Sequence, residues 1–150
     1  SLGKYEDAAN AFPFDRTLLV RSAETALFAA EQERIDRGVF LAIAEEKISD
    51  LAILTREQDA MIWLLSSWRV ALIADVPLLK ELAKEAQERM PSTVDTYRIL
   101  THSFQLVGDT LSAGKIKQSL RDILPDFWQD KEGRARILWK ENPWLQEYVE

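Results

Sequence analysis

The sequence predicts an all-α fold, a right-handed superhelical stack of antiparallel helix pairs with about 7–8 helices. Two observations lead to this fold class. The chain of 150 residues contains only five glycines and five prolines, and residues that favour helices dominate it. The chain also repeats itself with an offset of 34 residues, which is a typical length for a unit of two helices. Hydrophobic residues make up 47% of the chain, enough to build a buried core.

The repeat is clearest between residues 60 and 126. There Asp75 aligns with Asp109, and Pro91 aligns with Pro125. The other matched pairs are Trp63 with Tyr97, Val70 with Phe104, Leu72 with Leu106, Ile73 with Val107, Leu82 with Ile116 and Met90 with Leu124. Gly108 can adopt the left-handed conformation that ends a helix, and Asp109 can cap the next one. Each unit is therefore predicted to hold two helices, the second of which ends before a proline.

The segment before this repeat contains a longer unit. Apolar residues at helical spacing predict a first helix over residues 15–30 and a long second helix over residues 34–54, with room for a break near Ser49 and Asp50. The sequence Thr-Arg-Glu-Gln at 55–58 has the pattern of a capping box and predicts that the next helix starts there. Pro13 and Pro91 are 78 residues apart, so this unit is about ten residues longer than the other repeats.

We expect a single helical-repeat domain with five parts. These are a partial repeat over residues 1–13, a stretched repeat over 14–54, repeats over 55–91 and 92–125, and a C-terminal cap over 126–150. The cap contains a predicted helix at 131–141 and many aromatic residues, which are expected to cover the open edge of the stack. Because the chain starts without a methionine and within a repeat, we expect it to be a fragment of a longer chain.

Residues 94–126 carry a recognisable set of positions. Tyr97 is a large residue in the first helix, Gly108 and Asp109 form the turn, Ala113 is a small residue in the second helix, and Pro125 follows it. With these positions the segment resembles a tetratricopeptide repeat. The resemblance implies that the first helices line a concave groove and that the domain binds a protein or peptide segment, as a scaffold or adaptor.

The resemblance also implies which residues line the groove. They run from an apolar part to a polar part and are Val20, Phe28, Leu64, Trp68, Arg98, His102 and Gln105, together with Asp95. Glu24, Trp68 and His102 are expected at equivalent positions of successive repeats. The lysines and asparagines with which this family clamps a terminal carboxylate are not at these positions, so apolar anchors are expected to dominate binding.

A second resemblance concerns the N-terminal part of the chain. Residues 11–15 (AFPFD), followed by Leu18 and Leu19 and an alanine-rich helix, resemble the soluble C-terminal region of bacterial O-antigen polymerase and O-oligosaccharide ligase membrane proteins. This resemblance implies a periplasmic domain, tethered to a membrane, that positions glycan or partner proteins, while the transferase residues lie in membrane-side loops that this sequence does not contain. Without it, a cytoplasmic location is expected.

Composition argues against several other functions. The net charge of −6 disfavours nucleic acid as a partner. With no cysteine and one histidine, neither a metal site nor another cofactor is expected. The segment from Gly108 to Lys115 differs from a phosphate-binding loop, because five residues separate its glycines and Ile116 follows the lysine. We therefore expect no catalytic residues and no enzyme activity in this chain.

Overall fold

The computed structural model describes residues 2–11, 14–89 and 94–123. Every regular element in these ranges is an α-helix, which confirms the predicted all-α class. The helices are α1 (Leu2–Ala11), α2 (Arg16–Gln32), α3 (Arg37–Thr55), α4 (Met61–Leu72), α5 (Val76–Arg89), α6 (Val94–Leu106) and α7 (Thr110–Ile123). The predicted cap, including its helix at 131–141, lies outside the described residues.

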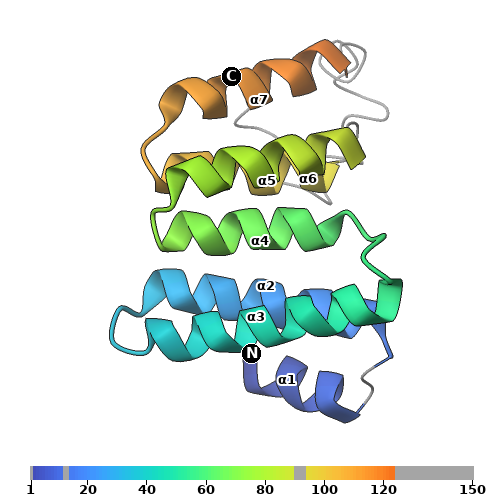
Figure 1. The fold of residues 1–150 in the computed structure, drawn as a ribbon. Helices are drawn as coiled ribbons and strands as arrows, with labels where there is room; N and C mark the ends of the chain where they lie inside the picture. Colours follow the sequence, from blue (N-terminus) through green and yellow to red (C-terminus); the bar gives the residue numbers. More distant parts are fainter. Residues whose placement is uncertain (1, 12–13, 90–93, 124–150) are drawn as a thin grey trace, which may run out of the picture.

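Six of these helices pack in adjacent pairs, α2 with α3, α4 with α5 and α6 with α7. Figure 1 shows the pairs stacked along one axis, with α1 at one end and α7 at the other. The described stack of pairs thus holds six helices rather than the expected 7–8, because α1 packs on α2 and is not followed by a pair partner of its own. Helix α4 is the most enclosed, since it packs against α2, α3, α5 and α6.

Local signals account for the bounds of α2. The Asp15 carboxylate accepts a hydrogen bond from the Leu18 amide at 3.2 Å and caps the first turn. One face of the helix is buried along its length and consists of Leu19, Ser22, Ala23, Ala26, Leu27 and Ala30. At the other end, Arg37 Nε donates to the Ala30 carbonyl at 2.8 Å, so a side chain of α3 satisfies a carbonyl that the helix leaves unpaired. The helix predicted over residues 15–30 is confirmed.

Helix α3 continues through Ser49 and Asp50, where the sequence left room for a break. Ser49 is exposed and Asp50 half-buried, while their neighbours Ile48 and Leu51 are buried. The predicted capping box at 55–58 is wrong. Thr55 is the last residue of α3 and donates its hydroxyl to the Leu51 carbonyl at 2.8 Å.

Two left-handed residues follow α3 and explain why α4 starts later than expected. Arg56 has φ 52° and Glu57 has φ 60°, so the chain cannot begin a right-handed helix there. The N-cap residue is Ala60, and the carboxylate of Asp59 just before it accepts a hydrogen bond from the Met61 amide at 3.0 Å. The N-cap therefore stands five positions beyond the predicted one.

The turns α4–α5 and α6–α7 are the same structure at an offset of 34 residues. Each helix ends on a left-handed residue, Ala74 with φ 58° and Gly108 with φ 75°. In both turns the next amide reaches back to the preceding helix, Asp75 N to Val70 O at 3.1 Å and Asp109 N to Phe104 O at 3.0 Å. Both aspartates then cap the following helix, with Leu78 N to Asp75 at 3.2 Å and Ser112 N to Asp109 at 3.0 Å. The internal repeat is thus present in the hydrogen bonds and not only in residue types.

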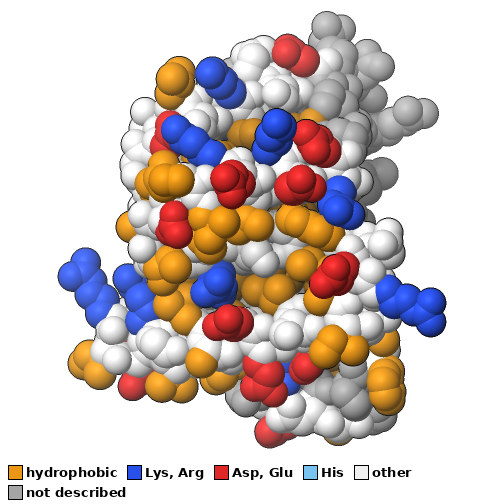
Figure 2. Space-filling view, viewed as in Figure 1, with side chains coloured by type: hydrophobic (Ala, Val, Ile, Leu, Met, Phe, Trp, Pro, Cys, Tyr) orange, Lys and Arg blue, Asp and Glu red, His pale blue; other side chains and the backbone are white. Residues whose placement is uncertain are grey.

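One buried cluster of apolar side chains runs through the pairs. It includes Leu27 of α2, Leu51 of α3, Leu64 of α4, Leu79 of α5 and Leu100 of α6, each fully buried. Figure 2 shows the face formed by α3, α5 and α7, where hydrophobic side chains gather in a band over α4 and charged side chains of both signs lie over α5 and α7. At the α4–α5 contact, the Arg89 guanidinium carbon lies 3.8 Å from the centre of the Trp63 ring.

Lys47 is a charged residue inside the core. Its side chain in α3 is only 2% exposed, and its Nζ donates a hydrogen bond to the Asn10 amide oxygen of α1 at 2.7 Å. The carboxylate of Glu46, which is exposed, lies 4.0 Å away. Contact with α1 thus supplies an acceptor for a buried ammonium group, and such a group is strongly unfavourable without one.

Candidate functional site

The residues predicted to line a groove lie at two depths. On α2, Phe28 is 57% exposed and Val20 is half-buried; on α6, Gln105 is exposed, and Arg98 and His102 are half-buried. These five residues lie on a surface formed by α2 and α6, which we call the α2–α6 face and which also includes Glu24 and Glu31. The side chain of Asp95 lies outside those that the structure describes.

The two predicted residues on α4 are core residues. Leu64 is fully buried and Trp68 is 7% exposed. Their depth follows from the position of α4, which four other helices enclose. Leu64 therefore offers no surface to a partner, and Trp68 presents only an edge.

Glu31 of α2 contacts both α4 and α6 at one point of the α2–α6 face. A single oxygen of its carboxylate accepts a hydrogen bond from Trp68 Nε1 and lies 2.5 Å from His102 Nε2. The two rings also touch, with centroids 5.4 Å apart and planes at 89°, an edge-to-face contact. The Glu31 side chain is 11% exposed and the His102 side chain 41% exposed, so the carboxylate is shielded from solvent while part of the imidazole ring is accessible.

A second bridge crosses from α2 to α6 about two turns away. Arg98 Nη2 lies 3.0 Å from Glu24 Oε1, and Arg21 Nη1 lies 3.9 Å from the other oxygen of Glu24. Beside it is a hollow of about 180 Å³, lined by Arg16, Thr17, Val20, Arg21, Glu24 and Arg98. Both bridges pass over α4, so the α2–α6 face is held together by side chains that meet across the helix between them.

The side-chain pairs of this face could not be read from the repeat alignment. The repeat alignment gives Glu24, Trp68 and His102 equivalent positions but names no partner for any of them; the structure pairs Glu24 with Arg98 and brings Glu31 to His102. Glu31 was not predicted at all. The signal that could have found it is the spacing of Glu24, Phe28 and Glu31, which at i, i+4 and i+7 share one stripe of α2.

Asp59 anchors one end of the α2–α6 face. Its carboxylate forms a two-pronged ion pair with the Arg16 guanidinium, in which Arg16 Nη2 lies 3.1 Å from Asp59 Oδ1. Burial of the carboxyl raises its pKa, but the hydrogen bonds from Arg16 and from the Met61 amide outweigh burial and leave the pKa below its ordinary value of 3.8. Asp59 is thus a charged residue that the fold needs in its ionised form.

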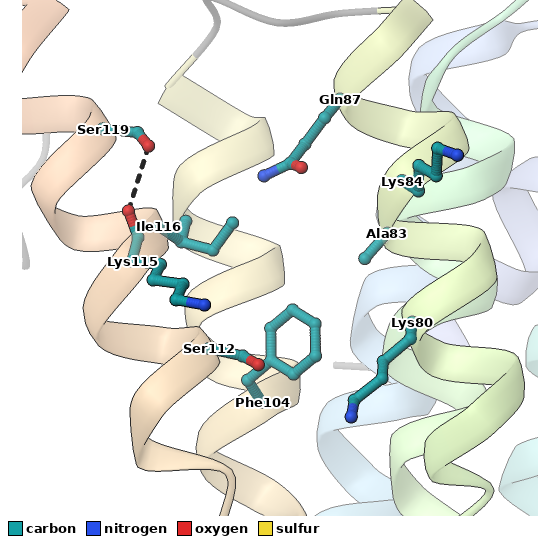
Figure 3. Close-up of a pocket in the computed structure, with 9 residues that line it drawn as sticks. All are labelled: Lys80, Ala83, Lys84, Gln87, Phe104, Ser112, Lys115, Ile116 and Ser119. Atoms are coloured by element: carbon teal, nitrogen blue, oxygen red, sulfur yellow. Dashed lines mark hydrogen bonds between the residues drawn. The ribbon is translucent and has the colours of Figure 1, made fainter.

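A different hollow lies between α5 and α7, and sequence reasoning missed it. Its volume is about 270 Å³, and Figure 3 shows its base formed by the ring of Phe104 from α6. The other lining residues are Lys80, Ala83, Lys84, Gln87, Ser112, Lys115, Ile116 and Ser119. We call it the lysine pocket. Its lysines come from two helices that only the tertiary fold brings together, so no local pattern could indicate it.

Two further findings concern the described residues. In residues 2–11, 14–89 and 94–123, no group of three or more histidine and acidic side chains is placed to hold a metal ion. None of the helices in this part of the chain is both long and apolar enough to cross a membrane.

Comparison with known proteins finds no matching family model, no matching curated protein and no matching solved structure. The tetratricopeptide-like and O-antigen polymerase-like resemblances therefore remain predictions from the sequence. The structure itself shows an all-α protein whose helices pack in adjacent pairs.

Proposed function

We propose that this chain is a non-catalytic helical-repeat module that binds a protein or peptide segment along the α2–α6 face and acts as a scaffold or adaptor. The observation that carries the proposal is the exposure of Phe28. Its aromatic ring is 57% exposed on the stripe of α2 that carries Glu24 and Glu31, both of which are bound to α6. Exposed aromatic residues on rigid surfaces are frequent anchors for partners.

The rigidity of the face supports a binding role. Because Glu24 holds Arg98 and Glu31 holds His102, a partner would meet side chains that are already ordered and would lose less entropy on binding. The hollow of about 180 Å³ next to Glu24 offers a place for one side chain of the partner. Gln105, which is exposed on α6, adds an amide that can hydrogen-bond an extended backbone.

Two buried serines use their hydroxyl groups within the fold. Ser67 donates its hydroxyl to the Trp63 carbonyl at 2.6 Å, and Ser103 donates to the Ile99 carbonyl at 2.7 Å. The single histidine of the chain directs Nε2 at Glu31. None of these contacts pairs a nucleophile with a base, as nucleophilic catalysis requires.

We also infer that the three helix pairs are copies of one tetratricopeptide-like unit and that they continue a right-handed superhelix. The identical hydrogen bonds of the turns at Ala74 and Gly108 support this for the last two pairs. The turn between α2 and α3 differs, as expected for the stretched unit.

The test compares two exposed apolar residues. Proteins captured by the immobilised chain are identified by mass spectrometry, and the bound segment of the best candidate is titrated as a synthetic peptide in a calorimeter. Loss of a buried phenylalanine contact is worth roughly 1.5–3 kcal/mol, so Phe28→Ser should weaken binding about tenfold or more. Ile35→Ser is the matched control, because Ile35 is 98% exposed in the α2–α3 connection. Equal affinity of the two variants would contradict the proposed site.

A further inference from the structure

We propose that the lysine pocket is a second, independent docking site, which takes an acidic segment of a partner protein with one apolar side chain inserted onto Phe104. The pocket belongs to α5, α6 and α7, and none of its lining residues belongs to the α2–α6 face. The inference therefore does not rest on the binding role proposed above.

The repeat geometry creates the pocket. Helices α5 and α7 both pack on α6, and the space between them is open above Phe104, whose side chain is only 4% exposed. Ala83 on one wall and Ile116 on the other are also nearly buried, at 4% and 7%. The bottom of the pocket is thus apolar, which suits a single apolar side chain.

The rim of the pocket is positively charged. Lys80 and Lys84 are one turn apart on α5, so they share a face, and Lys115 stands opposite on α7. Figure 3 shows the Lys80 and Lys115 side chains reaching toward the space around Phe104, while the Lys84 side chain points away from it. No acidic residue lines the pocket, although the chain as a whole carries a net charge of −6.

Nearby carboxylates neutralise this charge only in part. Asp109, outside the lining, uses its carboxylate to accept hydrogen bonds from the Ser112 hydroxyl at 2.7 Å and the Ser112 amide at 3.0 Å. These bonds, and more weakly the charges of Lys80 and Lys115, lower its pKa. Among the described residues, none of the three lysines forms an ion pair with a side chain of this chain. Asp109 therefore lies close to the ammonium groups of Lys80 and Lys115, which form no ion pair with it.

The shape and charge of the pocket identify the class of ligand. Lys80 and Lys115 attract carboxylates through space, while a hollow of about 270 Å³ with an apolar base accommodates one side chain rather than a whole small molecule. A nucleic acid fits less well, because Phe104 is recessed and cannot offer an open face for base stacking, and because the negative chain would repel a long polyanion. An acidic peptide with an apolar residue satisfies both features.

The experiment uses a capped pentapeptide of four glutamates around one central leucine, titrated into the isotope-labelled chain and followed by amide chemical shifts. We expect saturable shifts confined to residues of α5, α7 and the end of α6, and an affinity that falls as salt is added. Replacing the leucine by serine should weaken binding at least about fivefold, because the apolar contact is lost. Shifts that spread over all basic surfaces, or no shifts at all, would overturn the proposal.

Two double variants separate the pocket from general charge. Lys80→Glu with Lys115→Glu should weaken peptide binding at least about tenfold, whereas Lys4→Glu with Arg34→Glu, which makes the same charge change at exposed residues of the other end of the stack, should leave it within about twofold. Phe28→Ser should leave it unchanged, so failure at one site is distinguishable from failure at the other. Equal losses in the two double variants, or tighter binding of a single-stranded oligonucleotide than of the peptide, would refute the assignment.

Discussion

The indole ring of Trp68 and the imidazole ring of His102 meet edge to face, with 5.4 Å between their centroids. The two residues are 34 positions apart in the sequence, so the same position of two successive repeats is in direct contact. Glu31 of the preceding pair binds both rings through one oxygen. Three helix pairs are thus connected at one point, and this point is part of the face to which we assign partner binding.

Removal of the Glu31 carboxylate should destabilise the fold. In Glu31→Ala the Trp68 Nε1–H loses its acceptor in a nearly buried position, and an unsatisfied buried donor costs roughly 1–3 kcal/mol. Glu31→Gln keeps an acceptor oxygen and should cost less. Chemical denaturation followed by circular dichroism measures both. The control is Glu33→Ala at an exposed position nearby, which is expected to change the unfolding free energy by less than about 0.5 kcal/mol. If Glu31→Ala lost no more stability than Glu33→Ala, the cluster around Glu31 would add no stability.

Asp59 should make the unfolding free energy depend on pH in the acidic range. Its pKa is lower in the folded chain than its ordinary value of 3.8, so the stability that it contributes is fully present above that value and is lost as pH falls through the folded pKa. Asp59→Asn keeps a capping oxygen but loses the charge that binds Arg16. We expect it to lower the unfolding free energy by about 1 kcal/mol near neutral pH, with the difference from the unaltered chain shrinking below pH 3.8.

Urea titrations at several pH values test this, and Asp36→Asn is the control. Asp36 precedes α3 but makes no side-chain capping bond. Its replacement should have little effect at any pH. A deficit in Asp59→Asn that persists undiminished in acid would mean that the carboxylate charge is not what stabilises this end of α4.

Exchanging alanine and glycine in the two equivalent turns should change the unfolding free energy in opposite directions. Ala74 and Gly108 both have positive φ, at 58° and 75°, a conformation that glycine adopts more readily than alanine. Ala74→Gly should therefore raise the unfolding free energy by about 0.5–1 kcal/mol, and Gly108→Ala should lower it by a similar amount. A Cβ at Gly108 would have no atom within 4 Å, so the loss is a backbone effect.

Thermal unfolding of the two variants and of their combination tests the equivalence of the turns. The combined variant should lie near the unaltered chain, because the two changes oppose each other at separate sites. Gly114→Ala, in the interior of α7, is a control in which alanine should stabilise. A stabilising effect of Gly108→Ala would contradict the left-handed turn.

Lys47 and Asn10 should be strongly coupled. Asn10→Ala removes the acceptor of a buried ammonium group and should cost roughly 1–3 kcal/mol. Lys47→Met replaces that group with an apolar side chain of similar length and should be neutral or stabilising. In the Lys47→Met background, Asn10→Ala should have little effect. A double-mutant cycle by urea denaturation measures the coupling, and additive losses would show that the hydrogen bond does not link α1 to α3.

The sequence alone predicted the helical class, the bounds of α2 and α3 to within about three residues, and the correspondence of the turns at Asp75 and Asp109. These depend on local chemistry, since Asp15 caps the helix that follows it and Gly108 ends the helix that precedes it within a few residues. The helix start predicted at Thr55 was wrong, because Arg56 and Glu57 after it are left-handed and neither residue type indicates that conformation.

Only the tertiary structure decided which residues are available to a partner. Leu64 and Trp68 lie at groove positions by repeat spacing, but α4 is enclosed by four helices and both residues are buried. The contact of Glu31 with His102 and the gathering of Lys80 and Lys115 around Phe104 join helices far apart in the chain. Periodicity specifies the face of a helix on which a residue lies, whereas depth and contacts depend on which helices become its neighbours, and that is settled when the pairs pack together.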